Sequence, residues 1–190
     1  MTWLALGLFL FLGIHLTQAV MPRQRQAAIA MLGEKGWKGL YTVVSLVGFG
    51  LILWGYSLAR QQPVLLWPAI RGMNHAAAML MLVAMVLLAA AYVPRNHLKA
   101  KLQHPMTLAV KTWAFAHLIA NNTLADVMLF GSFLVWAIVV FRAARRRPAP
   151  AAAPGTAAGT AATVAVGLVF WAVFAFWAHA AWLGISPMGR

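Results

Sequence analysis

The chain has 190 residues, of which 63% are hydrophobic and only 9% are charged, and its mean hydropathy is +0.80. No water-soluble core can hide so much apolar surface, so the composition excludes a soluble domain and predicts a protein that lies in lipid. The net charge is +13, with 15 Lys and Arg against the acids Glu34 and Asp126, and in a membrane protein this excess indicates basic loops rather than a nucleic-acid surface.

The first two predicted helices cover residues 2–20 and 39–59, and each is long enough to cross a hydrocarbon layer of about 30 Å. The first is apolar from its start, without the basic region and cleavage site of a signal peptide, so we expect it to remain as a membrane helix. A basic loop is expected after it, from residue 22 onward. In the second helix Ser45, Gly48 and Gly55 share one face, and small residues there predict close packing against a neighbouring helix.

The middle of the chain holds three more predicted helices, over residues 74–93, 105–121 and 124–141. The loop over residues 61–72 carries a short apolar piece between two prolines, which favours an interfacial or re-entrant segment. Thr123 and Asp126 are spaced like a capping pair at the start of the third of these helices, and we interpret Asp126 as a cap rather than a catalytic group.

A Pro-, Ala- and Gly-rich stretch separates the last predicted helix, residues 163–183, from the others. We therefore expect a five-helix transmembrane core over residues 1–147, a cytoplasmic linker over 148–161, and a sixth helix with a short tail over 162–190. The sixth helix is expected to pack with the core as one domain.

The distribution of Lys and Arg predicts the orientation of the bundle. The first, third and fifth connections hold four, three and four of them, whereas the opposite side holds only Arg60, Arg71 and Arg190. Because basic loops stay in the cytoplasm, the fold class predicted here is an all-α, polytopic bundle of about six transmembrane helices with both termini periplasmic. The chain is expected to cross the membrane several times.

Histidine is the strong metal ligand in this chain, because cysteine is absent and thiolate ligands are therefore excluded. His97 lies among basic loop residues and is interpreted as a solvated side chain. The other five touch or enter predicted helices, where an ionisable group is a candidate functional residue: His15, His75, His104, His117 and His179.

Depth in the bilayer favours two of these five histidines. His15 lies about 8 Å from the cytoplasmic end of its helix and His117 about 18 Å from the cytoplasmic start of its own, so both are inside hydrocarbon. Two neutral imidazoles on different helices suit the axial positions of a b-type haem. The alternative for each is an interhelical hydrogen bond to a carbonyl or hydroxyl. The secondary metal candidates are His75, His104 and His179.

Three further residues on the helix over 105–121 are candidates for contacts with a cofactor. Trp113 and Asn121 lie one turn on either side of His117, where Trp113 would pack on a flat macrocycle and Asn121 would orient a ligand or substrate. Lys111 shares another face with His104, and its ammonium either snorkels to water or pairs with an anion such as a haem propionate.

The stretches GLYTVVSLVGFGLILWGY, residues 39–56, and HPMTLAVKTWAFAHLIANNTLADVMLFGSFLVWA, residues 104–137, resemble the NnrU family of bacterial membrane proteins. The resemblance spans nearly the whole chain except the linker, and it implies an association with denitrification, particularly nitrite and nitric oxide metabolism. The family is also similar to zeta-carotene isomerase, a haem b membrane enzyme. That similarity implies that His15 and His117 are axial ligands, and ligand exchange with cysteine is impossible here.

Three functions follow as hypotheses. The first is a haem b protein with redox or isomerase-like activity, whose partners are the lipid bilayer and a small gas or a polyene. The second is a transporter or channel for a small nitrogen-oxide solute, with Lys111, His104 and His117 along the path. The third is an assembly partner of a respiratory complex. If the protein is an enzyme, the resemblance implies a haem-dependent isomerase or redox protein.

Overall fold

The structure, a computed structural model, describes residues 1–148 and 153–188, and most of them are helical. Helices are what the apolar runs require in lipid, because hydrocarbon offers no partner for a backbone group outside a helix. The helices are α1 (Thr2–Val20), α2 (Pro22–Gln61), α3 (Met73–Tyr92), α4 (His97–Leu102), α5 (Pro105–Ala120), α6 (Leu124–Arg145) and α7 (Ala157–Val173), followed by the π-helical turn η1 (Phe174–Ala178) and α8 (His179–Leu183).

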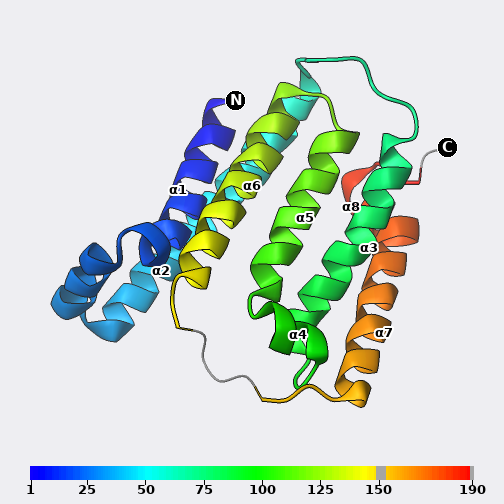
Figure 1. The fold of residues 1–190 in the computed structure, drawn as a ribbon. Coiled ribbons are helices and arrows are strands. Elements are labelled where there is room, and N and C mark those ends of the chain that lie inside the picture. Colours follow the sequence, from blue (N-terminus) through cyan, green and yellow to red (C-terminus); the bar gives the residue numbers. More distant parts are fainter. Residues whose placement is uncertain (149–152, 189–190) are drawn as a thin grey trace.

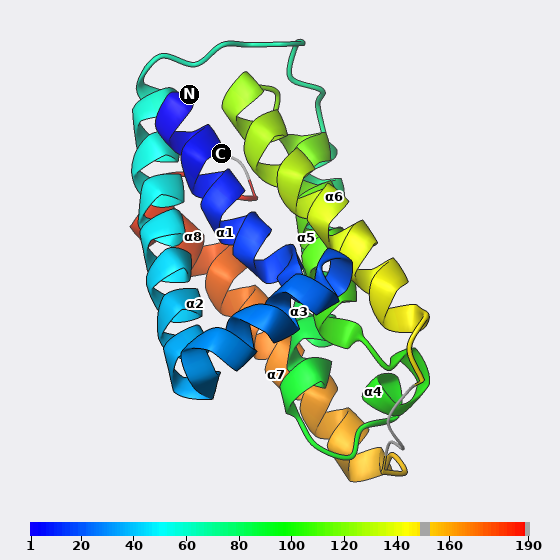
Figure 2. The same cartoon turned by 90° about the vertical axis from the view of Figure 1, so that its left-hand side faces the viewer.

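The long helices pack side by side in an order that differs from their order in the chain. α1 packs on α6, α6 on α5, α5 on α3 and α3 on α7, while α2 covers α1 from the other side (Figures 1 and 2). Helix α6 therefore lies between α1 and α5. This arrangement decides which candidate side chains can meet.

Five helical segments are long and apolar enough to cross a membrane, among the residues that the structure describes. They are α1, α2, α3, α6 and the continuous segment of α7, η1 and α8 over Ala157–Leu183. Helix α5 has only 16 residues, a rise of about 24 Å against a hydrocarbon layer of about 30 Å, although it runs beside α3 and α6. The membrane-spanning helical character is confirmed, and the count of six crossings stays a prediction.

The loop predicted after α1 is instead helical. Helix α2 begins at Pro22, where the missing N–H is tolerated in the first turn, and it bends at Gly33, which has φ 71° and ψ 166°. Residues 26–32 are mostly good helix formers, and the basic side chains around them do not prevent a helix at the membrane surface. The bend turns this first part of α2 away from the bundle (Figure 1).

The sixth predicted helix begins earlier than expected. Helix α7 starts at Ala157, with the Thr156 side chain accepting a hydrogen bond from the Gly159 N–H as an N-cap. The end of the predicted linker is therefore helical, and residues 149–152 of that linker lie outside the described residues. Helix α7 packs on α3, so the segment joins the side of the bundle far from α1.

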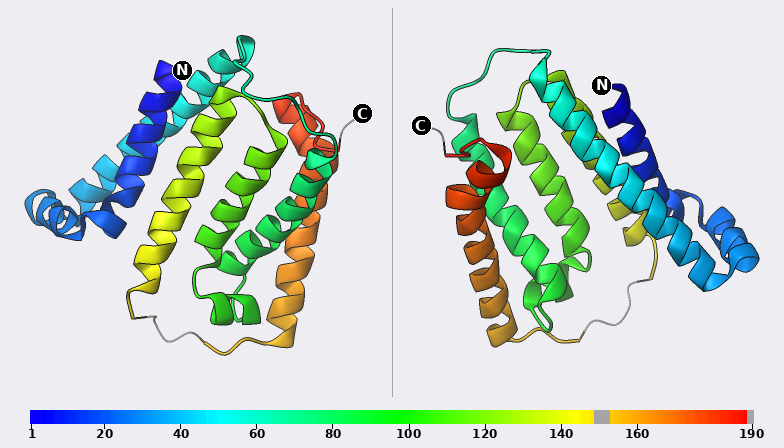
Figure 3. Two further views of the ribbon diagram at one scale, coloured as in Figure 1. Left: turned by 45° about the horizontal axis from the view of Figure 1, so that its top comes forward. Right: turned by 180° about the vertical axis from the view of Figure 1, so that it is seen from behind.

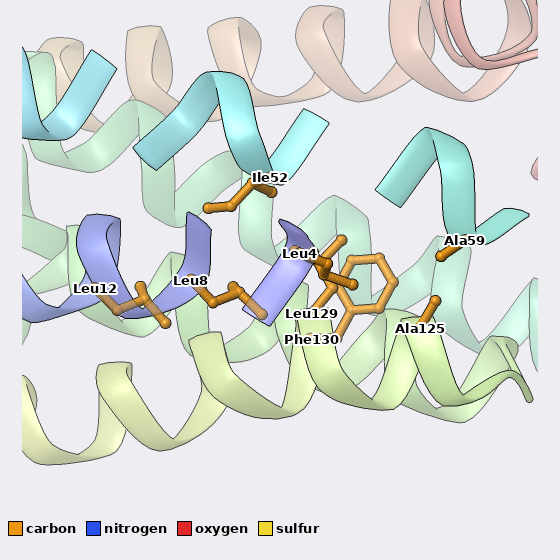
Figure 4. Close-up of a cluster of buried hydrophobic side chains, with 8 residues drawn as sticks. All are labelled: Leu4, Leu8, Leu12, Ile52, Ala59, Ala125, Leu129 and Phe130. Atoms are coloured by element: carbon orange, nitrogen blue, oxygen red, sulfur yellow. The ribbon is translucent and has the colours of Figure 1, made fainter. Parts of the chain in front are cut away.

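The contact between α1 and α2 is a backbone-to-backbone contact at glycine. A Cβ added at Gly48 would lie 2.7 Å from the Phe11 nitrogen, and one added at Gly55 would collide with the backbone at Leu4. The predicted packing role of these glycines is confirmed. Beside this contact lies a buried apolar cluster from α1, α2 and α6 (Figure 4): Leu4, Leu8, Leu12, Ile52, Ala59, Ala125, Leu129 and Phe130.

The basic connections gather at one end of the bundle (Figure 1). We call this the basic end, and its cations are Arg23, Arg25, Lys35, Lys38, Arg95, Lys99, Lys101, Arg142, Arg145, Arg146 and Arg147. Arg60, in the last turn of α2, donates to the Leu183 carbonyl at the end of α8, and Arg71 lies in the connection between α2 and α3 at the other end of the bundle (Figure 1). Arg190 lies outside the described residues. The Lys and Arg residues thus gather at one end of the bundle, as their distribution among the connections predicts. That this end faces the cytoplasm stays a prediction.

Candidate histidine and aromatic site

His15 lies five residues before the end of α1, with its ring held by its own helix. Its Nδ1 is 2.6 Å from the carbonyl oxygen of Phe11, one turn earlier. Because a carbonyl oxygen only accepts, Nδ1 carries the proton and the neutral ring keeps the lone pair on Nε2. His15 is therefore oriented with one unprotonated nitrogen directed away from its tether.

His117 repeats this arrangement on α5. Its Nδ1 donates to the carbonyl oxygen of Trp113 at 2.9 Å, and its ring stacks on Phe130 of α6 with centroids 4.6 Å apart. Asn121 donates from Nδ2 to the carbonyl oxygen of His117 at 2.8 Å, so it contacts the backbone of His117 rather than its ring. Two histidines on two helices thus make the same Nδ1 contact, and the neutral form of each has its lone pair on Nε2.

The two imidazoles do not contact each other, because α6 lies between α1 and α5 (Figure 3). A row of aromatic rings links them instead. Phe11 contacts His15 at 4.3 Å and Phe133 at 6.0 Å, and Phe133 of α6 contacts Trp113 at 5.4 Å, measured between ring centroids. Trp113 in turn lies 5.3 Å from His117.

Two residues near His15 were not identified from the sequence. Tyr41 of α2 has its ring centroid 5.0 Å from that of His15, and Trp136 of α6 has its centroid at 6.4 Å. The Nε1 of Trp136 is buried and has no hydrogen-bond partner. No sequence signal separates Trp136 from the other eight tryptophans; only the packing of α6 against α1 brings it to His15.

Lys111 and His104 both contact the ring of Phe141, in line with their predicted position on one face of the helix. The Nζ of Lys111 lies 5.0 Å from the centroid of Phe141, and the ring of His104 lies 6.3 Å from it. The ammonium is thus held over an aromatic face near the basic end of α6. Among the described residues, neither side chain makes a hydrogen bond or a ring contact with His15 or His117.

The remaining histidines are dispersed. His75 is exposed at the start of α3, and His97 contacts the Thr160 hydroxyl through Nδ1 at 2.8 Å. His179 follows the π-helical turn η1 and has its Nδ1 2.7 Å from the carbonyl oxygen of Ile185. Within the described residues no group of three or more His, Asp or Glu side chains forms a metal cluster.

Asp126 is a cap, as predicted, and also holds α2. Its carboxylate accepts from the Thr123 N–H and hydroxyl, while the Asp126 N–H donates to the Thr123 hydroxyl oxygen, which makes a complete capping box. Tyr56 of α2 adds a third bond, its hydroxyl donating to Oδ1 at 2.5 Å. The cap therefore fastens the start of α6 to α2, a link that the sequence did not indicate.

The donor chemistry at His15 and His117 fits haem iron. Each imidazole has its Nδ1–H fixed by a carbonyl, which is the outer-shell contact that orients a metal-bound histidine and increases its basicity. The buried Trp136 N–H beside His15 is a donor that lacks an acceptor. The surroundings of both rings are aromatic, as suits a flat macrocycle.

Comparison with known proteins identifies one family. The model of the NnrU protein family matches residues 3–187, which is nearly the whole chain. No curated protein and no solved structure is similar enough to match the chain.

Proposed function

The chain belongs to the NnrU family, and from this premise we propose that it is a multi-pass membrane protein that binds haem b through His15 and His117. One observation carries the proposal: both histidines donate from Nδ1 to the carbonyl one turn earlier, which leaves Nε2 of each neutral ring available as a ligand. A histidine kept only for an interhelical hydrogen bond has no need of this matched arrangement on two helices.

The residues around the two rings would have distinct parts in holding haem. Phe133 and Trp113 connect the two imidazoles through a row of ring contacts and would pack on the macrocycle. For both histidines to reach one iron, these rings and the part of α6 between α1 and α5 would have to shift. The Trp136 N–H would donate to a polar group of the ligand. Lys111, held over Phe141, is a cation within the bundle for an anionic propionate.

The bound haem would supply an iron centre for a small gas such as nitric oxide, in line with a link to denitrification. An isomerase-like action on a polyene is the enzymatic form of the same proposal. Both kinds of ligand dissolve in hydrocarbon, so they would approach α1, α5 and α6 from within the bilayer. We place the protein in the bacterial inner membrane, with the basic end in the cytoplasm and both termini periplasmic.

The haem content of purified protein tests the proposal. The full chain, produced in cells supplied with haem, should carry haem b, and His15→Ala and His117→Ala should each lose most of it. His97→Ala is the matched control, because that ring is exposed and pairs with Thr160. A colourless wild-type protein that is folded would overturn the proposal, and so would full haem content in both variants.

A further inference from the structure

A groove runs along the outside of the bundle between α1 and α6. It has a volume of about 450 Å³ and is partly open. Its walls are mainly apolar, with Leu12 and Leu16 on α1 and Val127, Gly131, Val135 and Val139 on α6, and Ser132 of α6 is the polar side chain among them. The other four α6 residues recur every four positions, so they form one continuous stripe on that helix.

The groove has the length of one lipid chain in one leaflet. From Val127 to Val139 the helix rises about 18 Å, and half of the hydrocarbon layer is about 15 Å. Gly131 opens the middle of the stripe, since a Cβ placed there would meet nothing within 4 Å. A narrow apolar groove of this length fits an acyl chain lying along α6.

The same stripe ends in two arginines. Arg142 follows Val139 by three residues and Arg146 by seven, so both continue its face into the basic end. Both are exposed, and no hydrogen bond or ion pair holds either one among the described residues. The adjacent arginines, in contrast, are hydrogen-bonded: Arg145 donates to the Gln103 side chain at 3.1 Å and Arg147 donates to the carbonyl of Gln18.

Neither acidic side chain of the protein is available for Arg142 and Arg146. Glu34 pairs with Lys38 at 3.4 Å, and Asp126 is buried at the opposite end of α6. A fixed counter-charge for these two arginines would therefore come from outside the protein. A second copy of this chain does not provide it, because the basic end of that copy carries the same excess of cations.

From the groove and the two arginines together we propose a binding site for an anionic phospholipid. One acyl chain lies between Leu12 and Val139, and the phosphate of the headgroup lies at Arg142 and Arg146. Trp136 also lines the groove and contacts His15, so the lipid chain packs against a side chain of the histidine site. The proposal does not depend on haem binding.

Lipid binding by the full chain, delipidated in detergent, tests the site. Phosphatidylglycerol and phosphatidylcholine with identical acyl chains are titrated, and bound copies are counted by native mass spectrometry. The wild type should bind one phosphatidylglycerol about tenfold or more tightly than phosphatidylcholine: both carry a phosphate, but the choline ammonium of phosphatidylcholine cancels its charge and is repelled by the two arginines. Equal affinity for the two lipids would overturn the proposal.

Two pairs of variants separate the groove from the charge. Gly131→Leu fills the groove and should weaken both lipids about tenfold, whereas Gly50→Leu, at an equally open position on α2, should not. Replacing Arg142 and Arg146 with Gln should bring phosphatidylglycerol down to the affinity of phosphatidylcholine. The same change at Arg23 and Arg25 should leave the preference intact.

Two results would contradict the site. Unchanged binding by Gly131→Leu would show that the groove holds no chain. An equal loss of preference in the Arg23 and Arg25 variant would show diffuse attraction to the whole basic end. Circular dichroism of each variant checks that it is folded, and the arginine variant, whose changes are exposed, tests the site even if Gly131→Leu unfolds.

Discussion

At the scale of single residues, two tryptophans that cannot be told apart by sequence differ in the hydrogen bonding of their indole nitrogens. Trp171 of α7 donates from Nε1 to the carbonyl oxygen of Ala78 at 2.8 Å, whereas the Nε1 of Trp136 is buried without a partner. A buried donor that finds no acceptor costs free energy rather than contributing it. The N–H of Trp171 therefore contributes to the stability of the fold through its hydrogen bond, whereas the N–H of Trp136 does not.

This difference predicts opposite effects of the same substitution. Trp171→Phe removes the indole hydrogen bond to the Ala78 carbonyl and should lower the free energy of unfolding by about 0.5–1.5 kcal/mol. Trp136→Phe removes an unpaired N–H and should leave the free energy of unfolding of the cofactor-free protein unchanged or raise it. Denaturant unfolding in detergent micelles measures both, and an equal loss in the two variants would contradict this assignment.

The pairing of the histidines also belongs to the residue scale. The sequence indicates which histidines lie in helices, and spacing correctly places Trp113 beside His117 and Lys111 beside His104. It does not indicate the order of helices in the bundle, so it misses that α6 separates His15 from His117 and brings Trp136 to His15. Contacts between helices depend on packing, which no local pattern encodes.

At the scale of elements, apolar runs predict helices well and their ends less well. The first helix was predicted over the residues that α1 covers, and α5 and α6 begin where predicted. The errors are at Pro22 and Ala157, where proline and glycine suggested loops. Proline is tolerated in the first turn of a helix, and Gly159 fits because its α-carbon packs close to the carbonyl of Arg95.

The glycines between α1 and α2 give a prediction at this scale. A Cβ at position 48 meets backbone atoms of Phe11, which cannot move as a flexible side chain does, so Gly48→Ala should cost about 1–3 kcal/mol of stability. Gly50→Ala adds a Cβ with nothing within 4 Å and should be neutral or stabilising by up to about 1 kcal/mol. Thermal unfolding of the two variants in the same detergent compares them; a milder effect at position 48 than at position 50 would refute the close contact.

At the scale of the whole molecule, the sequence predicts at which end of the bundle each connection lies, but it does not predict how the helices pack. The gathering of the first, third and fifth connections at one end could be predicted, because helices that cross a layer in turn must alternate their ends. Helix α5 is too short to be counted as a membrane crossing from its length and composition. Its packing beside α3 and α6 shows that it runs within the bundle.

The orientation can be measured directly because the natural chain has no cysteine. Lys101→Cys places a thiol at the basic end, and Arg71→Cys places one at the other end, both at exposed positions. A membrane-impermeant maleimide added to spheroplasts should label position 71 and spare position 101 until the membrane is opened. Labelling of position 101 in sealed spheroplasts, with position 71 protected, would reverse the proposed orientation.

The central claim is that His15 and His117 ligate one haem iron. Electron paramagnetic resonance of the purified ferric protein tests it most directly, because two axial imidazoles give a low-spin signal and the loss of one gives a high-spin signal or a haem-free protein. We predict low-spin iron in the wild type and its loss in both His15→Ala and His117→Ala. A low-spin signal that persists in either variant, or a folded wild-type protein without haem, would contradict the account.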